Sequence, residues 1–255
     1  LDDIVLKGKT ILLRADLNVP AKDGVVTDAS RIDRLKPTIT YLQNAGAKTL
    51  ILSHFGRPDG RPAPELSLEF LVPELKDRWG VEIAFARDCI DVPAETLSGA
   101  LSEGQFGLLE NVRFHAGEEA NDPAFAKQLA DLGDIFINDA FSAAHRAHAT
   151  TQKLAEYLPS AAGRLMESEL KALTKALESP VRPVMASVGG AKISTKLDLL
   201  ENLVEKTDIL VLGGGMANTF LFARGRDIGK SLCEKDMAQK ATTILRKAGE
   251  KGCEI

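Results

Sequence analysis

The segment from Ala186 to Lys196 reads Ala186-Ser187-Val188-Gly189-Gly190-Ala191-Lys192-Ile193-Ser194-Thr195-Lys196. An apolar run over 184–188 predicts a buried strand, and the two glycines and residues of helical spacing that follow predict a tight turn and a helix. Such a succession presents free backbone N–H groups and the positive end of a helix dipole to one spot. That spot suits an anion, most often a phosphate.

Lys192 and Lys196 lie four residues apart, which predicts that both ammonium groups lie on one face of the first helical turns. The segment follows neither the Walker A pattern nor G-x-G-x-x-G, because it lacks the glycine spacing of both. Two interpretations therefore stay open for this segment alone. It is either a phosphate cradle or a helix start that carries two solvated lysines.

On both sides of this segment, apolar runs alternate with segments of helical periodicity. The predicted strands cover 11–14, 49–52, 81–85, 107–109, 135–137, 184–188 and 208–212. The predicted helices cover 32–45, 67–79, a segment that begins at Asp122-Pro123, 163–178, 216–223 and 234–248. This alternation predicts an α/β fold with mainly parallel sheets.

The predicted helix over 163–178 separates two runs of strands and helices, and prolines follow it at 180 and 183. We interpret it as the connector between a complete first domain and the beginning of a second. In the helix predicted over 32–45, Pro37 predicts a late start or an irregular first turn, because proline removes a backbone donor.

Composition indicates an ordinary globular protein: 255 residues, 44% hydrophobic and 27% charged, with a net charge of −4. Slight acidity argues against a nucleic-acid or membrane-surface protein, whose mark is a basic excess. The sequence has neither an apolar stretch of bilayer length nor a basic-then-apolar leader, so we expect a soluble, cytoplasmic protein. The chain lacks an initiator Met and stops at Ile255 where a strand is expected to start, which suggests truncation.

Neither the cysteines nor the histidines form a familiar metal-ligand pattern. Cys89, Cys233 and Cys253 are odd in number and have no metal spacing, so we interpret them as reduced thiols. His145 and His148 are spaced i and i+3 but lack a convincing third ligand. We therefore predict no metal site in this chain.

Polar side chains follow the strands of the first domain at their carboxyl ends, where open α/β sheets bind ligands. They are Asp16, Asn18 and Arg31 after the first strand, His54 and Arg57 after the second, Arg113 and His115 after the fourth, and Asp139, His145 and Arg146 after the fifth. Guanidinium groups match phosphate and carboxylate geometry, so this gathering predicts a site for a small, multiply charged anion.

Each of these residues also has a structural interpretation. Asp16 and Asn18 are typical turn formers, and Asp139 could cap a helix. His115 and His148 are more typical of structural or solvated residues, and a single arginine is usually a surface charge that contributes little. Their joint placement favours the anion site, because surface charges have no reason to gather at strand ends.

Two phosphate-suited sites on two α/β lobes joined by a helix favour phosphoryl transfer between two bound substrates. This chemistry depends on positioning and charge neutralisation more than on a covalent nucleophile. Consistently, no nucleophile and base pair stands out in the sequence.

The sequence closely resembles phosphoglycerate kinase over essentially its full length. Six motifs in the family's order carry the resemblance: Arg14-Ala-Asp-Leu-Asn-Val-Pro20, Ser53-His-Phe-Gly-Arg-Pro58, Leu109-Glu-Asn-Val-Arg-Phe114, Asp139-Ala-Phe-Ser-Ala-Ala-His-Arg-Ala-His148, Gly189-Gly-Ala-Lys192 and Gly213-Gly-Gly-Met216.

The resemblance implies two Rossmann-like lobes with mainly parallel sheets, joined by a long helix, with the second lobe incomplete. It implies a phosphoglycerate-binding lobe over 1–162, an interdomain helix over 163–179 and the first part of a nucleotide-binding lobe over 180–255. The implied reaction is reversible phosphoryl transfer between 1,3-bisphosphoglycerate and ADP, giving 3-phosphoglycerate and ATP, with Mg²⁺ accompanying the nucleotide. The resemblance implies a place in glycolysis, gluconeogenesis or carbon fixation and leaves open which of them. We expect a monomer without nucleic-acid or membrane partners.

Carried over motif by motif, the resemblance implies the residues of both substrate sites. The phosphoglycerate site is expected to comprise Asp16, Asn18, Arg31, His54, Arg57, Arg113 and Arg146. The nucleotide site is expected to comprise Lys192, Lys196, Gly190, Gly213, Gly214 and Gly215. Arg31 and Lys192 are the expected catalytic residues, which steady the phosphoryl group in flight when the hinge closes. The attacking oxygen is already ionised at neutral pH, so no general base is required.

This sequence departs from the family pattern at Leu17, Ser142-Ala143 and Thr195, none of which removes a carried-over charge. The larger departure is length, because the family continues past Ile255 to an acidic residue for the ribose and a turn that holds the magnesium ligand. We expect the fragment alone to be inactive or weakly active. The alternative function is a non-catalytic phosphoanion-binding fragment. A dinucleotide-dependent enzyme is a weaker third interpretation, because G-x-G-x-x-G is missing.

Overall fold

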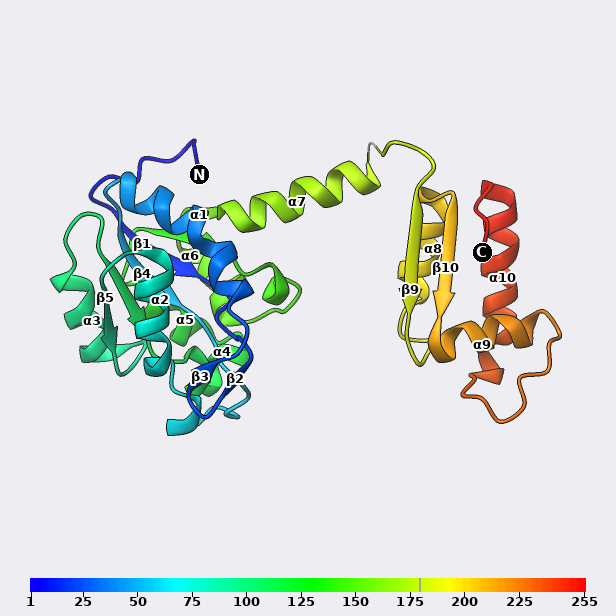
Figure 1. The fold of residues 1–255 in the computed structure, drawn as a ribbon, viewed down its shortest axis with the longest axis horizontal. Coiled ribbons are helices and arrows are strands. Elements are labelled where there is room, and N and C mark those ends of the chain that lie inside the picture. The colour runs from blue at the N-terminus through cyan, green and yellow to red at the C-terminus, as the bar shows by residue number, and fades with distance from the viewer. Residues whose placement is uncertain (179) are drawn as a thin grey trace. The chain divides into compact units, whose positions relative to one another are not determined.

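A computed structural model describes residues 1–178 and 180–255 (Figure 1). Ser179, the last residue of the interdomain helix that the resemblance implies over 163–179, lies outside the described residues. The chain forms two compact units, an N-terminal unit over Leu1–Glu169 and a C-terminal unit over Leu170–Ile255. The lobe boundaries at 162 and 180 stay predictions.

The described residues of the N-terminal unit form a parallel sheet of six strands: β1 (Thr10–Arg14), β4 (Lys48–Leu52), β5 (Ile83–Ala86), β6 (Phe106–Leu109), β7 (Ile135–Asn138) and β8 (Ser160–Ala162). Their order in the sheet is β5-β6-β4-β1-β7-β8. Strands β4, β5 and β6 therefore lie on one side of β1, with β6 between β4 and the edge strand β5, and β7 and β8 lie on the other side. Such a change of side opens a crevice at the carboxyl ends of the central strands.

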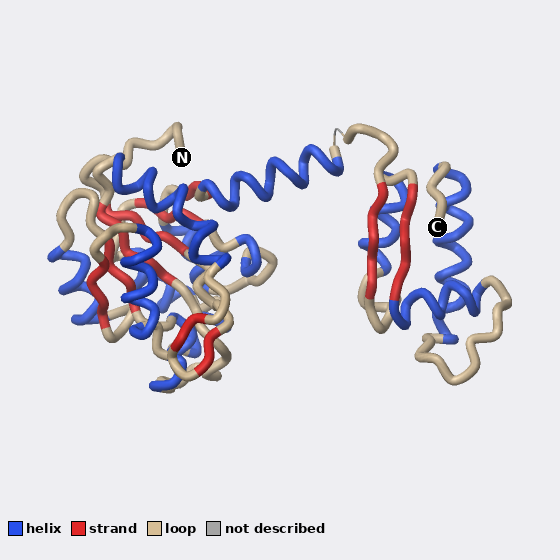
Figure 2. Tube along the Cα trace, viewed as in Figure 1, coloured by secondary structure: helices blue, strands red, loops and turns tan. Residues whose placement is uncertain are grey.

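Helices cover both faces of this sheet, as the secondary-structure colours of Figure 2 show. They are α1 (Ser30–Asn44), α2 (Val72–Trp79), α3 (Asp91–Ala100), α4 (Ala116–Glu119), α5 (Pro123–Ala130) and α6 (Leu154–Tyr157). Shorter helical turns are η1 (Pro64–Leu66), η2 (Glu69–Leu71), η3 (Val112–Phe114), η4 (Phe141–Ala143) and η5 (Ala149–Lys153), and β2 (Ala21–Lys22) pairs antiparallel with β3 (Val25–Val26).

Two hydrophobic cores lie on opposite faces of the sheet, because side chains alternate along each strand. In β1, Ile11 and Leu13 join the core that α1 and α2 cover, and Leu12 joins the core that α3, α5 and α6 cover. Burial on both faces explains why these strands read as continuous apolar runs. The α/β class with a mainly parallel sheet is confirmed.

Two of the predicted helices differ from the helices in the structure. α1 begins at Ser30 and continues through Pro37, so the predicted late start is wrong. Buried Ile32 and Ile39 hold the helix against the core on both sides of the proline, whose own position faces solvent. The segment predicted as one helix over 67–79 is instead η2 followed by α2.

The helix α7 (Arg164–Leu177) begins at a buried carboxylate. Asp139 accepts a hydrogen bond from the Met166 backbone N–H at 2.8 Å and one from the Thr38 hydroxyl at 2.6 Å. The Arg164 N–H donates to the same hydroxyl at 3.0 Å. Asp139 thus satisfies first-turn donors of α7, as the structural interpretation of this residue expected.

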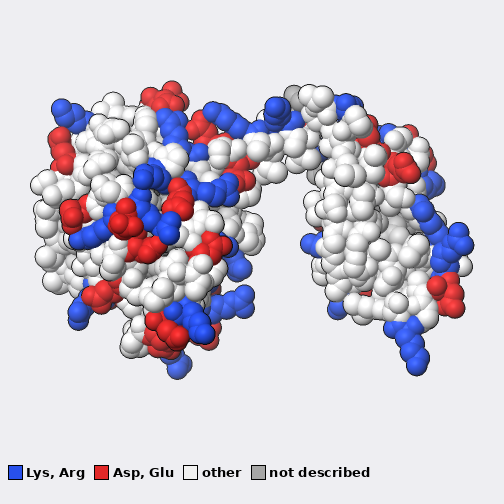
Figure 3. All heavy atoms as spheres, viewed as in Figure 1, with Lys and Arg blue, Asp and Glu red and all other residues white. Residues whose placement is uncertain are grey.

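The C-terminal unit pairs two parallel strands, β9 (Met185–Gly189) and β10 (Ile209–Gly213). Its helices are α8 (Leu197–Lys206), α9 (Gly214–Ala223) and α10 (Ala238–Lys251), with the turn η6 (Lys235–Met237). Their core includes Val188, Leu200 and Ile244. In the view of Figure 3, charged side chains are sparse over β9 and β10, where Met185 and Val211 are exposed.

None of the helices in the described part of the chain is long and apolar enough to cross a membrane.

Candidate functional site

The crevice at the carboxyl edge of the N-terminal sheet collects the residues predicted to bind an anion. The segments after β1, β4, β6 and β7 meet at this edge because the four strands are parallel neighbours. Six of the seven predicted side chains come from these segments and the seventh comes from α1: Asp16, Asn18, His54, Arg57, Arg113, Arg146 and Arg31.

Asp16 holds the α1 side of the site. Its buried carboxylate accepts a hydrogen bond from Arg31 Nη1 at 2.8 Å and one from the Ser142 hydroxyl. Arg31 Nη1 also lies 3.2 Å from the Asn18 carbonyl, while almost half of the arginine side chain stays exposed. A cavity of about 190 Å³ opens beside Asp16, Arg31 and Ser142. Asp16 therefore orients a partly exposed guanidinium towards this cavity.

Gly56 joins two other members of the site through its backbone. Its N–H donates to Asn18 Oδ1 at 3.0 Å, and its carbonyl accepts from Arg113 Nη1 at 2.9 Å. The residue has φ +62°, and a Cβ there would lie 2.7 Å from the Leu66 side chain. Glycine is therefore required at the turn that positions Asn18 and Arg113.

His54 is a neutral, buried imidazole. Burial lowers its pKa to about 2, and the charges of Arg14 and Arg113 act in the same direction. Arg14 Nη2 lies 2.9 Å from His54 Nδ1. Because arginine can only donate, Nδ1 accepts this hydrogen bond and the ring proton lies on Nε2. His54 can thus donate a hydrogen bond to an anion through Nε2 without carrying charge.

The buried network beneath His54 is a part of the site that the sequence did not predict. Arg14 is fully buried, and its Nε donates to the Thr150 hydroxyl at 2.9 Å. Thr150 in turn donates through its hydroxyl (2.6 Å) and its N–H (2.9 Å) to the buried carboxylate of Glu118. The only sequence signal for this network is a charged residue that ends an apolar strand.

Like charges gather around His54 and Arg113. Burial lowers the pKa of the Arg113 guanidinium, Glu119 opposes that shift, and nearby Arg146 and Arg57 reinforce it. Arg113 Nε lies 3.1 Å from Glu119 Oε1 without hydrogen-bond alignment. The repulsion among these arginines would be relieved by a bound anion.

We expect the low pKa of His54 to make folding stability depend on pH. Unfolded histidine titrates near 6.5, so the unfolded chain binds more protons between pH 6.5 and about 2, and stability falls as pH falls through that window. His54→Gln keeps an acceptor for Arg14 but cannot titrate. From pH 7 to pH 5 its free energy of unfolding should fall about 2 kcal/mol less than that of the unchanged chain.

Urea unfolding at pH 7, 6 and 5 measures this difference. His145→Gln, at an exposed histidine, controls for the loss of an imidazole. Parallel pH profiles for the unchanged chain and His54→Gln would contradict a neutral, buried His54.

In the C-terminal unit, Lys192 and Lys196 do not lie on a helix. β9 ends at Gly189 and α8 begins only at Leu197, so both lysines belong to the connecting loop. The prediction that they share a face of the first helical turns is therefore wrong. The hydrogen bonds of the loop explain its shape: Glu234 accepts from the Ser194 N–H (3.0 Å) and hydroxyl (2.6 Å).

The glycines of this unit permit two backbone segments to approach closely. Gly213 ends β10, and Gly214 and Gly215 already belong to α9, so the three glycines expected in the nucleotide site form the junction of a strand and a helix. Gly214 has φ +67°, and a Cβ on it would lie 2.8 Å from the Gly190 carbonyl oxygen. A Cβ on Gly215 would lie 2.7 Å from the carbonyl oxygen of Ala191.

The close approach of these segments also occupies a backbone N–H group that an anion bound after β9 could otherwise contact. The Met216 N–H, in the first turn of α9, donates to the Gly190 carbonyl at 2.9 Å. Lys196 passes over Gly190, since its Cε lies 3.3 Å from the position of an added Cβ. Lys192 is exposed. The carboxyl ends of β9 and β10 therefore bring together Gly190, Gly213, Gly214 and Gly215, with Lys196 beside them, and Lys192 lies exposed on the same loop.

The doubly wound sheet carries positively charged side chains at the carboxyl ends of its strands. This arrangement defines an α/β protein with a site suited to anions. The sequence model of the family described as phosphoglycerate kinase matches residues 1–255. The chain therefore belongs to the phosphoglycerate kinase family.

Relatives and solved structures agree with this membership. The chain is 62% identical over 255 residues to a phosphoglycerate kinase of Rhodospirillum centenum, covering all of this chain and 64% of that protein. The structure of phosphoglycerate kinase from Coxiella burnetii matches with a TM-score of 0.87 at 43% identity, over 100% of this chain and 64% of that one. Phosphoglycerate kinase from Pyrococcus horikoshii OT3 matches with a TM-score of 0.81 at 31% identity, over 100% and 66%. The chain thus spans about 64% of the length of the curated relative.

Proposed function

We propose that this chain is the phosphoglycerate-binding and part of the nucleotide-binding portion of a phosphoglycerate kinase. The reaction is reversible phosphoryl transfer between 1,3-bisphosphoglycerate and ADP, giving 3-phosphoglycerate and ATP. The observation that carries the proposal is the group of mutually repelling arginines around a neutral histidine in the N-terminal crevice. Family membership supports the same function.

In this proposal the N-terminal unit binds the phosphoglycerate. Arg57, Arg113 and Arg146 neutralise its phosphate, and His54 donates a hydrogen bond through Nε2. Asp16 holds Arg31 in place, and Asn18 accepts from the Gly56 backbone, which fixes the turn beside Arg113.

The C-terminal unit binds the nucleotide through Lys192 and Lys196. The glycines at 190 and 213–215 let the loop after β9 pack closely on the start of α9, which keeps Lys196 at the carboxyl ends of β9 and β10. Mg²⁺ enters with ADP or ATP as part of the substrate, and we assign it no ligand among residues 1–178 and 180–255.

The transfer itself needs charge stabilisation rather than a protein nucleophile. In the direction of ATP use, a carboxylate oxygen of 3-phosphoglycerate forms a bond to the γ-phosphorus of ATP. The bond from that phosphorus to the β–γ bridging oxygen breaks, and ADP leaves with the electron pair. Arg31 and Lys192 stabilise the phosphoryl group in flight through their positive charges.

A second candidate function is phosphoanion binding without catalysis. It is favoured by the gathering of arginines around His54 and Arg113, which lies wholly within the N-terminal unit and needs no second substrate. The two functions share the N-terminal anion site and differ only in turnover, so one set of experiments separates them.

The test begins with calorimetric titration of this chain with 3-phosphoglycerate and, separately, with ADP. We expect 3-phosphoglycerate to bind, and Arg113→Ala to weaken it about 10- to 100-fold, because a charge-assisted hydrogen bond is lost. Arg113→Lys should recover part of the affinity. Arg61→Ala removes an exposed arginine outside the site and serves as the control.

Phosphorylation of 3-phosphoglycerate by ATP is then measured in this chain and in a chain of the family's full length. If only the full-length chain turns over, the result supports the kinase function and leaves phosphoanion binding as the function of the shorter chain. Absence of 3-phosphoglycerate binding, or equal binding by Arg113→Ala, would overturn the site assignment.

A further inference from the structure

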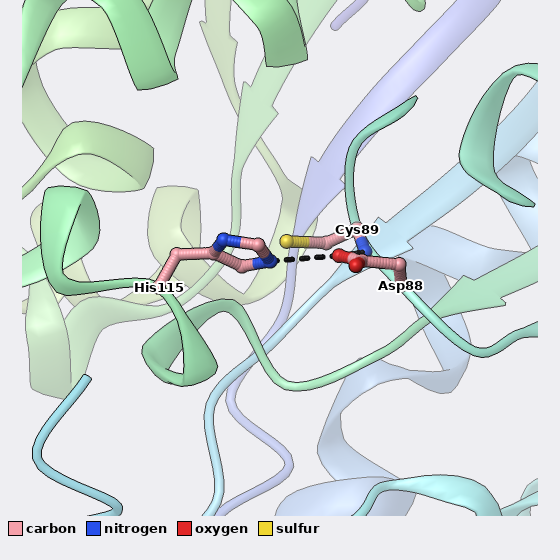
Figure 4. A group of neighbouring side chains, drawn as sticks. All are labelled: Asp88, Cys89 and His115. Atoms are coloured by element: carbon pink, nitrogen blue, oxygen red, sulfur yellow. Dashed lines mark hydrogen bonds and ion pairs between the residues drawn. The ribbon is translucent and has the colours of Figure 1, made fainter. Parts of the chain in front are cut away.

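Three side chains outside the proposed substrate sites bring metal-ligating atoms together in the N-terminal unit. Asp88, Cys89 and His115 each offer one such atom, and the three atoms lie within 4.8 Å of one another. Figure 4 shows the imidazole and the carboxylate pointing at each other, with the sulfur beside them. Asp88 and Cys89 follow β5, and His115 follows η3, so parallel strand ends bring these separate segments together.

Local contacts hold two of these side chains in place. Asp88 Oδ1 accepts from the Cys89 N–H at 2.7 Å and lies 2.7 Å from His115 Nε2. The His115 ring stacks on Phe125 with its centroid 5.2 Å away. A carboxylate and an imidazole fixed in this way lose little conformational freedom when they bind a ligand.

The cluster also has a path to solvent. A cavity of about 370 Å³ is lined by Asp88 and His115 together with the carboxylate-bearing Glu69 and Glu110. The Asp88 and His115 side chains are 37% and 28% exposed, whereas Cys89 is fully buried behind them. A cation could therefore enter from the cavity, meet the thiol from one side and keep a water molecule on the other.

We propose that Asp88, Cys89 and His115 form a binding site for a borderline-soft divalent cation, with Zn²⁺ as the preferred ion. Thiolate sulfur and imidazole nitrogen favour zinc over Mg²⁺ or Ca²⁺, and three protein ligands plus water is a common zinc arrangement. Neighbouring ligand atoms of a tetrahedral zinc ion lie about 3.5 Å apart, so the three atoms need to shift by only about 1 Å.

The sequence predicted no metal site, because Asp88 and Cys89 are distant from His115 along the chain and form no known spacing. The competing interpretation is a structural hydrogen bond between Asp88 and His115. In that interpretation Cys89 is only a buried core residue, so the test depends on whether its sulfur binds the metal.

Cobalt(II) is the probe, because a Co²⁺–thiolate bond produces a near-ultraviolet charge-transfer absorption that carboxylates and imidazoles alone do not produce. We expect the reduced chain to bind one Co²⁺ with this absorption, and one equivalent of Zn²⁺ to remove it. Cys89→Ser should abolish the band, and His115→Gln should weaken Co²⁺ binding about tenfold or more. Cys233→Ser, at a thiol outside the cluster, should leave the band unchanged.

Circular dichroism and thermal melting first establish that each variant is folded. Cys89 is buried, so His115→Gln, at a partly exposed position, keeps the test decisive if Cys89→Ser does not fold. Absence of the absorption in the unchanged chain would overturn the proposal. Its survival in Cys89→Ser, or undiminished Co²⁺ binding by folded His115→Gln, would do the same. None of these readouts depends on kinase activity.

Discussion

Replacing Gly163 with alanine should destabilise the N-terminal unit by about 3 kcal/mol. A Cβ at this position would lie 2.2 Å from both Cγ and Oδ1 of Asp139. The carboxylate cannot move away freely, because the Thr38 hydroxyl and the Met166 N–H hold it at 2.6 and 2.8 Å. The substitution must therefore either distort the chain at the start of α7 or break these hydrogen bonds in a buried place.

Urea unfolding followed by tryptophan fluorescence measures the loss, since the single tryptophan, Trp79, lies in the core of this unit. Gly99→Ala is the matched control, because a Cβ on Gly99 in α3 meets nothing within 4 Å. Gly99 lies in the last turn of α3, so alanine there should stabilise that variant by at most about 0.5 kcal/mol. If Gly163→Ala unfolds at the same urea concentration as the unchanged chain, the close packing of Asp139 against this glycine is refuted.

Replacing Lys192 with alanine should lower turnover about a thousandfold in a chain of the family's full length, while 3-phosphoglycerate affinity changes little. This expectation rests on the proposed function, in which Lys192 stabilises charge on the transferred phosphoryl group. The exposed loop position of Lys192 makes a large structural effect unexpected, because its side chain is not part of the core of the C-terminal unit. Steady-state kinetics with both substrates, and direct titration of 3-phosphoglycerate, give the two quantities.

Lys240→Ala provides the control, since it removes an exposed positive charge from α10. An interaction made only in the transition state lowers kcat without weakening the binding of the ground-state substrate. Equal losses in turnover and in 3-phosphoglycerate affinity would show instead that Lys192 shapes the fold.

Much of the fold could be predicted because the signals are local. The strand predicted at 11–14 is β1. The helix predicted to begin at Asp122-Pro123 is α5, where Asp122 accepts a hydrogen bond from the Phe125 N–H at 2.8 Å. Parallel strands bring their carboxyl ends to one edge, so the position of Asp16 or His54 after a strand already indicates where its side chain lies. The prediction was wrong where tertiary packing overrides a local preference, as in α1, which continues through Pro37.

The sequence by itself determined the α/β alternation and the set of polar residues at the sheet edge, because hydrophobic periodicity and position after a strand act over a few residues. Only the tertiary structure decided which partners those residues have. Arg14 sets the tautomer of His54, and Gly163 makes room for Asp139. Such pairs join segments far apart in the chain, and burial makes each contact depend on both partners. No local pattern contains that information.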